Sequence, residues 1–185
     1  MENVMAENYL CFLALLEMVI EDVIGKSYIN QYYLAEYFGI TVPYGTDITV
    51  NNITFSDKER EFGVHLDENK LNAFFKETGI PIETEYVYIN EFEESDYDTV
   101  DRSDLRRNSY IVYTYSYGSL YRKSELCNYG HAALLKSVVS ERTLEIYDPG
   151  PIGKGEKKID RHALYDAIRE INGGLYIFKI KKEYI

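Results

Sequence analysis

The stretch Cys11-Phe12-Leu13-Ala14-Leu15-Leu16-Glu17-Met18-Val19-Ile20-Glu21-Asp22-Val23 is the part of the sequence that decides the fold. Its apolar residues recur three and four positions apart, which predicts a helix over residues 9–23 that ends before Gly25. The remaining faces of this helix are also apolar, so we expect the helix to be buried on nearly all sides. The position of a cysteine in the first turn of so apolar a helix guides the interpretation of the rest of the chain.

Helices dominate the first half of the chain and strands the second half. Further helices are predicted over residues 28–38, 68–77 and 162–171, and strands over residues 86–89, 110–117, 131–139, 143–147 and 175–180. Ser27 and Asp67 are the expected N-caps of the first two of these helices, and Gly39 and Gly79 are the expected ends. The predicted fold class is α+β, with N-terminal helices packed on a mainly antiparallel sheet.

Length and composition indicate a globular chain with a packed core. Its 185 residues contain no internal repeat and no low-complexity linker, so we expect a single domain over residues 1–185. The acidic residues are concentrated over residues 83–101, which contain no basic residue. We interpret this interval as a solvated loop or a weakly ordered insertion.

The charge and the cysteine content exclude several classes of partner. The 31 acidic and 20 basic side chains give a net charge of −11, which repels nucleic acid and anionic membrane surfaces, so neither is an expected partner. The N-terminus lacks the basic start of a secretory signal, and the apolar run over residues 9–20 is too short to span a bilayer. Two cysteines cannot form a disulfide framework, so we expect thiols and a cytoplasmic location.

Cys11 is the first candidate for a reactive residue. The free N–H groups and the positive end of the helix dipole at a helix start stabilise a thiolate, which lowers the thiol pKa. Because free cysteines are also among the most buried residues, simple packing is the alternative interpretation. Cys127 is a second candidate, but in an extended segment it would lie roughly 13 Å from His131, and no predicted helix polarises it.

His131 and Asp148 are predicted at the ends of two neighbouring strands. His131 follows Gly130 at the start of one strand, and Asp148 ends the next. An antiparallel hairpin with a turn near residues 140–142 would bring Asp148 beside His131. The carboxylate is then expected to accept the imidazole Nδ1–H and to turn the other ring nitrogen toward the thiol. Asp148 also begins an Asp-Pro-Gly sequence, for which a simple turn residue is the alternative.

No cofactor and no metal are expected from the sequence. A metal site would require His65, Asp67 and His131 to converge, and neither His65 nor His162 has a Cys or His neighbour at metal-ligand spacing. Residues 150–156 are glycine-rich but lack the spacing of a phosphate-binding loop. We expect them to form a hairpin connection beside the site.

Four short motifs occur in the order Cys11-Phe12-Leu13-Ala14-Leu15-Leu16-Glu17-Met18, Ile29-Asn30-Gln31-Tyr32-Tyr33-Leu34-Ala35-Glu36-Tyr37-Phe38-Gly39-Ile40, Gly130-His131-Ala132 and Tyr147-Asp148-Pro149-Gly150. Together they resemble the double-glycine (bacteriocin) leader peptidase group of the papain-like cysteine peptidases, over nearly the whole chain. The resemblance implies a papain-like fold whose nucleophile helix packs on the sheet. It also implies Cys11 as nucleophile, His131 as general base and acid, and Asp148 as the residue that orients the imidazole.

The sequence differs from this group around the nucleophile. The group usually has a glutamine several residues before the cysteine and a glycine directly after it. Here Met5 stands six residues before Cys11, no glutamine precedes it, and Phe12 follows it. Asn8 is the expected side-chain donor to the oxyanion, together with the Cys11 N–H.

Two classes of function follow from these observations. The first is a thiol hydrolase or acyltransferase that forms an acyl-thioester on Cys11 with a peptide or acyl-carrier substrate, in bacterial natural-product or bacteriocin processing. The second is an inactive accessory or binding protein on the same scaffold, whose acidic surface recognises a basic partner. The missing glutamine and glycine favour the second class, and retention of Cys11, His131 and Asp148 favours the first. The sequence does not indicate an oligomeric state.

Overall fold

The computed structural model describes residues 3–6, 10–40, 47–50, 52–55, 66–93, 96–97, 101, 108–126, 129–150 and 153–181. Its helices are α1 (Cys11–Ile24), α2 (Gln31–Phe38), α3 (Glu68–Thr78), α5 (Tyr117–Tyr121) and α6 (Arg161–Glu170), with 3₁₀ turns η1 (Ile89–Glu91) and η2 (Ser124–Leu126). Its strands are β1 (Ile48–Val50), β2 (Ile53–Phe55), β3 (Ile82–Tyr88), β4 (Ser109–Ser116), β5 (Gly130–Ser140), β6 (Thr143–Asp148), β7 (Gly155–Asp160) and β8 (Gly174–Ile180).

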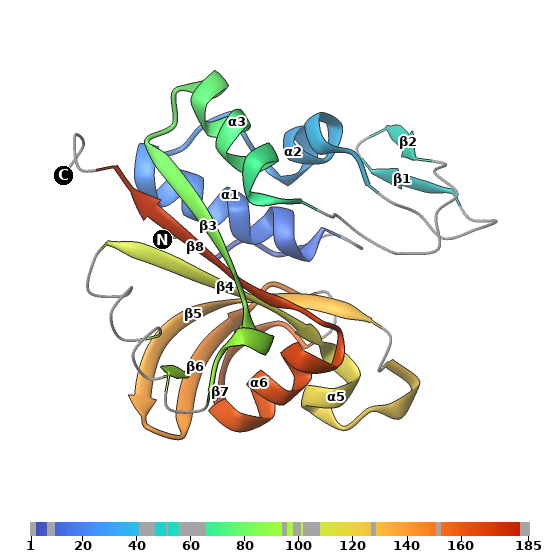
Figure 1. The fold of residues 1–185 in the computed structure, drawn as a ribbon. Coiled ribbons are helices and arrows are strands. Elements are labelled where there is room, and N and C mark those ends of the chain that lie inside the picture. Colours follow the sequence, from blue (N-terminus) through green and yellow to red (C-terminus); the bar gives the residue numbers. More distant parts are fainter. Residues whose placement is uncertain are drawn as a thin grey trace.

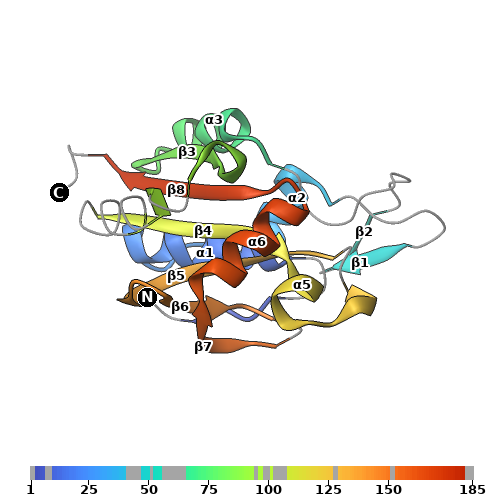
Figure 2. The same cartoon turned by 60° about the horizontal axis from the view of Figure 1, so that its bottom comes forward.

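A six-stranded sheet in the order β3-β8-β4-β5-β6-β7 forms the centre of the molecule, and every pairing in it is antiparallel. Helices α1, α2 and α3 lie on one face of this sheet, and α5 and α6 lie on the other (Figure 1). The hairpin β1-β2 is separate from the sheet and projects to one side (Figure 2). The α+β prediction, with N-terminal helices on an antiparallel sheet, is confirmed.

Helix α1 is buried on nearly every side, as its sequence predicts. Its buried residues are Phe12, Leu13, Ala14, Leu15, Leu16, Met18, Val19 and Ile20. They form one hydrophobic core with residues of α2, α3 and one face of the sheet, and α1 packs directly against β5. A second core lies between the other face of the sheet and α6. Within the described residues, no helix combines the length and apolar character needed to cross a membrane.

The predicted helix ends are confirmed for α3 and for the end of α2 at Gly39, whereas the start of α2 is corrected. The Asp67 carboxylate accepts the Lys70 N–H at 2.8 Å, and Gly79 ends α3 in the left-handed conformation with φ +70°. Helix α2 starts three residues later than expected, and its cap is Asn30, whose side chain accepts two N–H groups of the first turn. Ser27 accepts the Ile29 N–H at 3.1 Å and so closes a turn before the helix.

Two further regions differ from the expectation. Residues 155–160 form β7, a strand that was not predicted. Because β7 pairs antiparallel with β6 from Asp148 and Gly155 onward, the expected hairpin connection is present, but it ends before Gly155 and not at residue 156. The acidic interval over residues 83–101 is also not simply a loop, because residues 83–88 belong to β3. Asp101 is fully buried, where it forms an ion pair with Arg161 at 3.1 Å and accepts the Tyr113 hydroxyl at 2.6 Å. An acidic residue with these partners can lie inside the protein.

Truncation of Leu13 tests the packing of α1. Leu13→Ala removes atoms of a fully buried side chain, so we expect the free energy of unfolding to fall by about 2–5 kcal/mol. Ile24→Ala is the control at the exposed end of the same helix, and its effect is expected to stay below about 1 kcal/mol. Urea denaturation followed by circular dichroism measures both changes. Equal losses in the two variants would contradict the packing described here.

Candidate active site

The Cys11 thiol lies at the junction between the start of α1 and the start of β5. Cys11 is the first residue of the helix, and its side chain is partly exposed. The N-cap residue Leu10 makes no side-chain hydrogen bond to the helix, so the first N–H groups are open to other acceptors. The backbone N–H groups of Phe12 on the helix and of Ala132 on β5 help to lower the pKa of the thiol.

His131, the second residue of β5, connects Cys11 to Asp148. Its charge and hydrogen-bonding capacity lower the pKa of the Cys11 thiol, and its Nε2 lies 2.8 Å from Asp148 Oδ1. Two tyrosine rings stand edge-on to the imidazole, Tyr115 at 5.7 Å and Tyr117 at 5.2 Å between ring centroids. These contacts leave only 9% of the His131 side chain exposed and restrict its rotation.

Asp148 is the last residue of β6, and its side chain is fully buried. The pairing of Leu134 with Tyr147 makes Asp148 and His131 diagonal neighbours on one face of the sheet. The same carboxylate oxygen that contacts His131 also accepts the Gly150 N–H at 2.9 Å. Asp148 therefore lies beside His131, as expected. It also takes part in the Asp-Pro-Gly turn, which was the alternative interpretation of this residue.

The orientation of the imidazole differs from the expectation. Asp148 contacts Nε2, not Nδ1. Nδ1 is bonded next to the Cβ branch of the ring and therefore stays close to the backbone of β5. The N–H of Ala132, the next residue, contributes to the lowered pKa of the Cys11 thiol, so the thiol lies near this part of β5. The distal nitrogen Nε2 is thus the one that reaches across to the neighbouring strand.

The pKa shifts of Cys11 and His131 have a common electrostatic origin. Burial raises the pKa of the Cys11 thiol, but the charge of His131 and the hydrogen bonds to the sulfur outweigh burial and leave the pKa below its usual value. Burial lowers the pKa of His131, yet the charge of Cys11 and the hydrogen bond to Asp148 raise it to about 9. A thiolate–imidazolium pair is therefore favoured at pH values above the lowered pKa of Cys11 and below about 9, the pKa of His131.

The start of the chain runs beside these residues. The Ala6 N–H donates to the Pro149 carbonyl at 2.9 Å, directly after Asp148. The buried Gln31 side chain at the start of α2 donates to the Met5 carbonyl at 2.9 Å. Asn8, the expected oxyanion donor, lies outside the described residues.

Several other candidates are not brought into this site. Cys127 and His65 lie outside the described residues. The described part of the chain contains no group of three or more His, Cys, Asp or Glu residues that could hold a metal ion.

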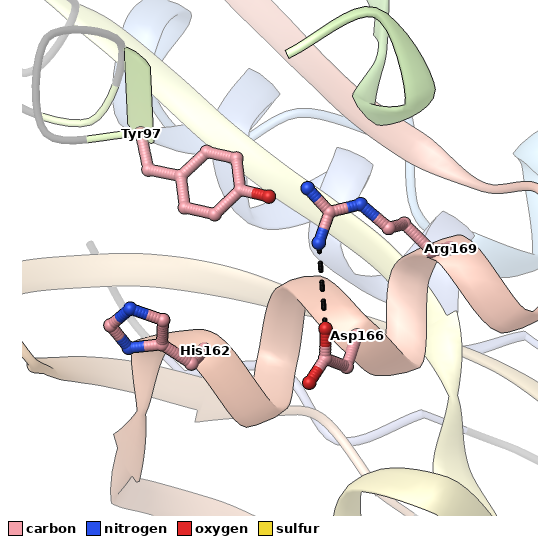
Figure 3. A pocket seen from close by; sticks show the side chains of 4 residues that line it. All are labelled: Tyr97, His162, Asp166 and Arg169. Atoms are coloured by element: carbon pink, nitrogen blue, oxygen red, sulfur yellow. Dashed lines mark hydrogen bonds and ion pairs between the residues drawn. The ribbon is translucent and has the colours of Figure 1, made fainter. Parts of the chain in front are cut away.

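His162 lies in a separate pocket on α6. This pocket has a volume of about 270 Å³ and is lined by Tyr97, His162, Asp166 and Arg169 (Figure 3). Arg169 and Asp166 form an ion pair at 3.4 Å, so their opposite charges compensate each other. The pocket includes neither a cysteine nor a member of the Cys11–His131–Asp148 group, and we assign the candidate chemistry to that group.

Sequence reasoning missed three tyrosines and one lysine around the triad. Tyr115, Tyr117 and Tyr121 surround His131 and Asp148 from β4 and α5, and Lys157 approaches Asp148 from β7. The alternation of Tyr113 and Tyr115 along β4, with Tyr117 directly after the strand, was a usable signal. Lys157 had none, because β7 itself was not predicted.

The chain shares its papain-like α+β fold with a protein of solved structure. The crystal structure of a Bacillus anthracis protein provisionally described as a C39-like peptidase superposes on it with a TM-score of 0.60. The alignment covers 96% of this chain and 93% of that chain, at 12% sequence identity. No protein-family model and no curated protein matches the sequence. The likeness is therefore one of fold.

The reactivity of Cys11 tests the electrostatics of the site. Because the Cys11 pKa is lowered, we expect rapid alkylation by iodoacetamide at pH 6, where a thiol with a pKa of about 8.5 is almost wholly protonated. His131→Ala deletes the stabilising cation and should move the rate profile toward that ordinary value. Peptide mass spectrometry separates Cys11 from Cys127. If Cys11 reacts no faster than Cys127 in the folded protein, yet equally fast after denaturation, it is a packed structural cysteine.

Proposed function

We propose that residues 1–185 form a single-domain papain-like thiol hydrolase, which cleaves a peptide through an acyl-thioester on Cys11. The observation that carries this proposal is the 2.8 Å contact of His131 with the buried Asp148, together with the electrostatic coupling of His131 to the Cys11 thiol. An accessory protein has no need of a cysteine with a lowered pKa beside a histidine with a raised one. Perturbed pairs of this kind are typical of active sites.

In the first step, the Cys11 thiolate attacks the carbonyl carbon of the scissile peptide bond. A C–S bond forms, and the negative charge moves to the carbonyl oxygen. When the C–N bond breaks, the His131 imidazolium gives its proton to the leaving amine. Asp148 holds the imidazole by its Nε2 throughout, so that Nδ1 carries the proton between sulfur and nitrogen.

In the second step, water attacks the thioester. His131, now neutral, takes a proton from the water as the new C–O bond forms, and the C–S bond breaks to return the Cys11 thiolate and release a carboxylic acid. An amine in place of water would give acyl transfer by the same steps. The oxyanion would be stabilised by the Cys11 N–H at the uncapped start of α1, with Asn8 as the proposed side-chain donor.

The substrate class proposed is a peptide. The fold of the C39-like neighbour and the resemblance of the motifs to the leader peptidase group both support it. Processing of a bacterial natural product or a bacteriocin, in the cytoplasm and without a cofactor, is part of the same proposal.

Peptide hydrolysis gives the direct test. We expect cleavage within a panel of peptides that includes one with a double-glycine sequence, read out by mass spectrometry of the products. Cys11→Ala should abolish cleavage, and Asp148→Asn should lower kcat by about 10⁴-fold, because the imidazole loses its orienting acceptor. The value of kcat/KM should rise with deprotonation of Cys11 and fall above about pH 9 as His131 loses its proton.

The products and the covalent intermediate distinguish the alternatives. Rapid acid quench followed by intact mass should detect an adduct on Cys11 in the wild type and none in Cys11→Ala. A product extended by an added amine would identify an acyltransferase. Binding of the panel without an adduct or a product would favour the accessory protein instead.

A further inference from the structure

Lys157 approaches the catalytic carboxylate from the edge strand. Its Nζ lies 3.4 Å from Asp148 Oδ2 and 4.4 Å from the centroid of the Tyr121 ring, and a quarter of its side chain is exposed. Lys157 lies on the same face of β7 as Gly155, the residue paired with Asp148. The lysine is thus on the far side of Asp148 from His131.

The two oxygens of Asp148 have different partners. Oδ1 contacts His131 at 2.8 Å and accepts the Gly150 N–H at 2.9 Å, whereas Oδ2 faces Lys157. With Cys11 as thiolate, His131 as imidazolium and Asp148 as carboxylate, the buried group carries one net negative charge. The ammonium of Lys157 makes the sum zero, and low-dielectric surroundings strengthen this compensation.

Resting on the function proposed above, we propose that Lys157 is a positioning residue that compensates the net negative charge of the ionised Cys11–His131–Asp148 group and thereby stabilises the Cys11 thiolate. It acts through Asp148 and touches no reacting atom. No motif around Lys157 points to this role; it follows from the placement of β7.

The ammonium is confined at this position. A Cβ added at Gly153 would lie 2.6 Å from Lys157 Nζ and 2.5 Å from the Tyr117 hydroxyl. Gly153 also has φ +76°, a conformation that disfavours other residues. The backbone at Gly153 therefore packs closely over the lysine and limits where its charge can move.

Other titratable groups around Asp148 are tyrosines, a glutamate and the triad members themselves. They come from every element packed against the site: Cys11 of α1, Tyr115 of β4, Tyr117 and Tyr121 of α5, His131 of β5, Tyr147 of β6, and Glu156 and Lys157 of β7. Burial raises the pKa of Tyr115, Tyr121 and Tyr147, so these tyrosines stay neutral when Cys11 titrates. Within this group, Lys157 is the cation whose removal changes the charge balance without breaking the triad.

The test measures Cys11 alkylation against pH in four variants. Lys157→Met and Lys157→Gln remove the charge, Lys157→Arg keeps it, and Lys158→Met is the matched control, because Lys158 is the exposed neighbour on the other face of β7. We expect the midpoint of the Cys11 profile to rise by about one pH unit in the two neutral variants, so that the rate on the acid limb falls about tenfold. Lys157→Arg and Lys158→Met should match the wild type.

The outcomes separate this inference from the proposed function. If the wild type shows a low midpoint for Cys11 and the neutral variants share it, the role of Lys157 is refuted while the hydrolase proposal stands. If Cys11 of the wild type is itself unreactive at low pH, the proposed function fails first. Loss of the fold in both neutral variants, judged by circular dichroism, would make Lys157 a structural residue and overturn the inference. A shift in Lys157→Arg equal to that in Lys157→Met would do the same, because charge would then not be the cause.

Discussion

The burial of the Asp148 carboxylate is the constraint on which the arrangement of the site depends. A charged group without exposure to water is stable only when its oxygens have donors, and Asp148 is fully buried. The donors come from His131 on β5, from Gly150 in the following turn and from Lys157 on β7. Three consecutive strands and the turn between two of them are therefore held in one register by a single side chain. On the other side of His131, the Cys11 sulfur extends the same chain of contacts to α1.

Much of the fold and the centre of the site could be predicted from the sequence, because local signals determine them. The spacing of apolar residues predicts α1, and an Asp67 cap with a Gly79 end predicts α3. The hairpin of β5 and β6 follows from two β-rich segments with a short turn. The geometry of this hairpin is sufficient to place His131 and Asp148 close together.

The parts that could not be predicted depend on contacts between distant segments. β7 reads Gly-Glu-Lys-Lys-Ile-Asp, with few β-forming residues, and becomes a strand because the edge of β6 offers it partners. The burial of Asp101 could not be predicted from its local sequence, because it depends on the ion pair with Arg161, which is far away along the chain. Asp148 contacts Nε2 of His131 and not Nδ1. Which nitrogen faces Asp148 depends on how α1 packs against β5, and the residue pattern of a strand does not determine that packing.

Phe12 stands directly after the candidate nucleophile Cys11, where the leader peptidase pattern usually has a glycine. Its ring packs against Tyr176 at 4.7 Å and Phe178 at 6.4 Å between centroids, both on β8, the strand next to the edge strand β3. The aromatic side chain thus fixes the first turn of α1 on the sheet, where a glycine would provide no side-chain packing. Its side chain points into the core, while the Cys11 thiol beside it faces His131. The difference at this position serves the packing of the helix and leaves the contacts of the triad intact.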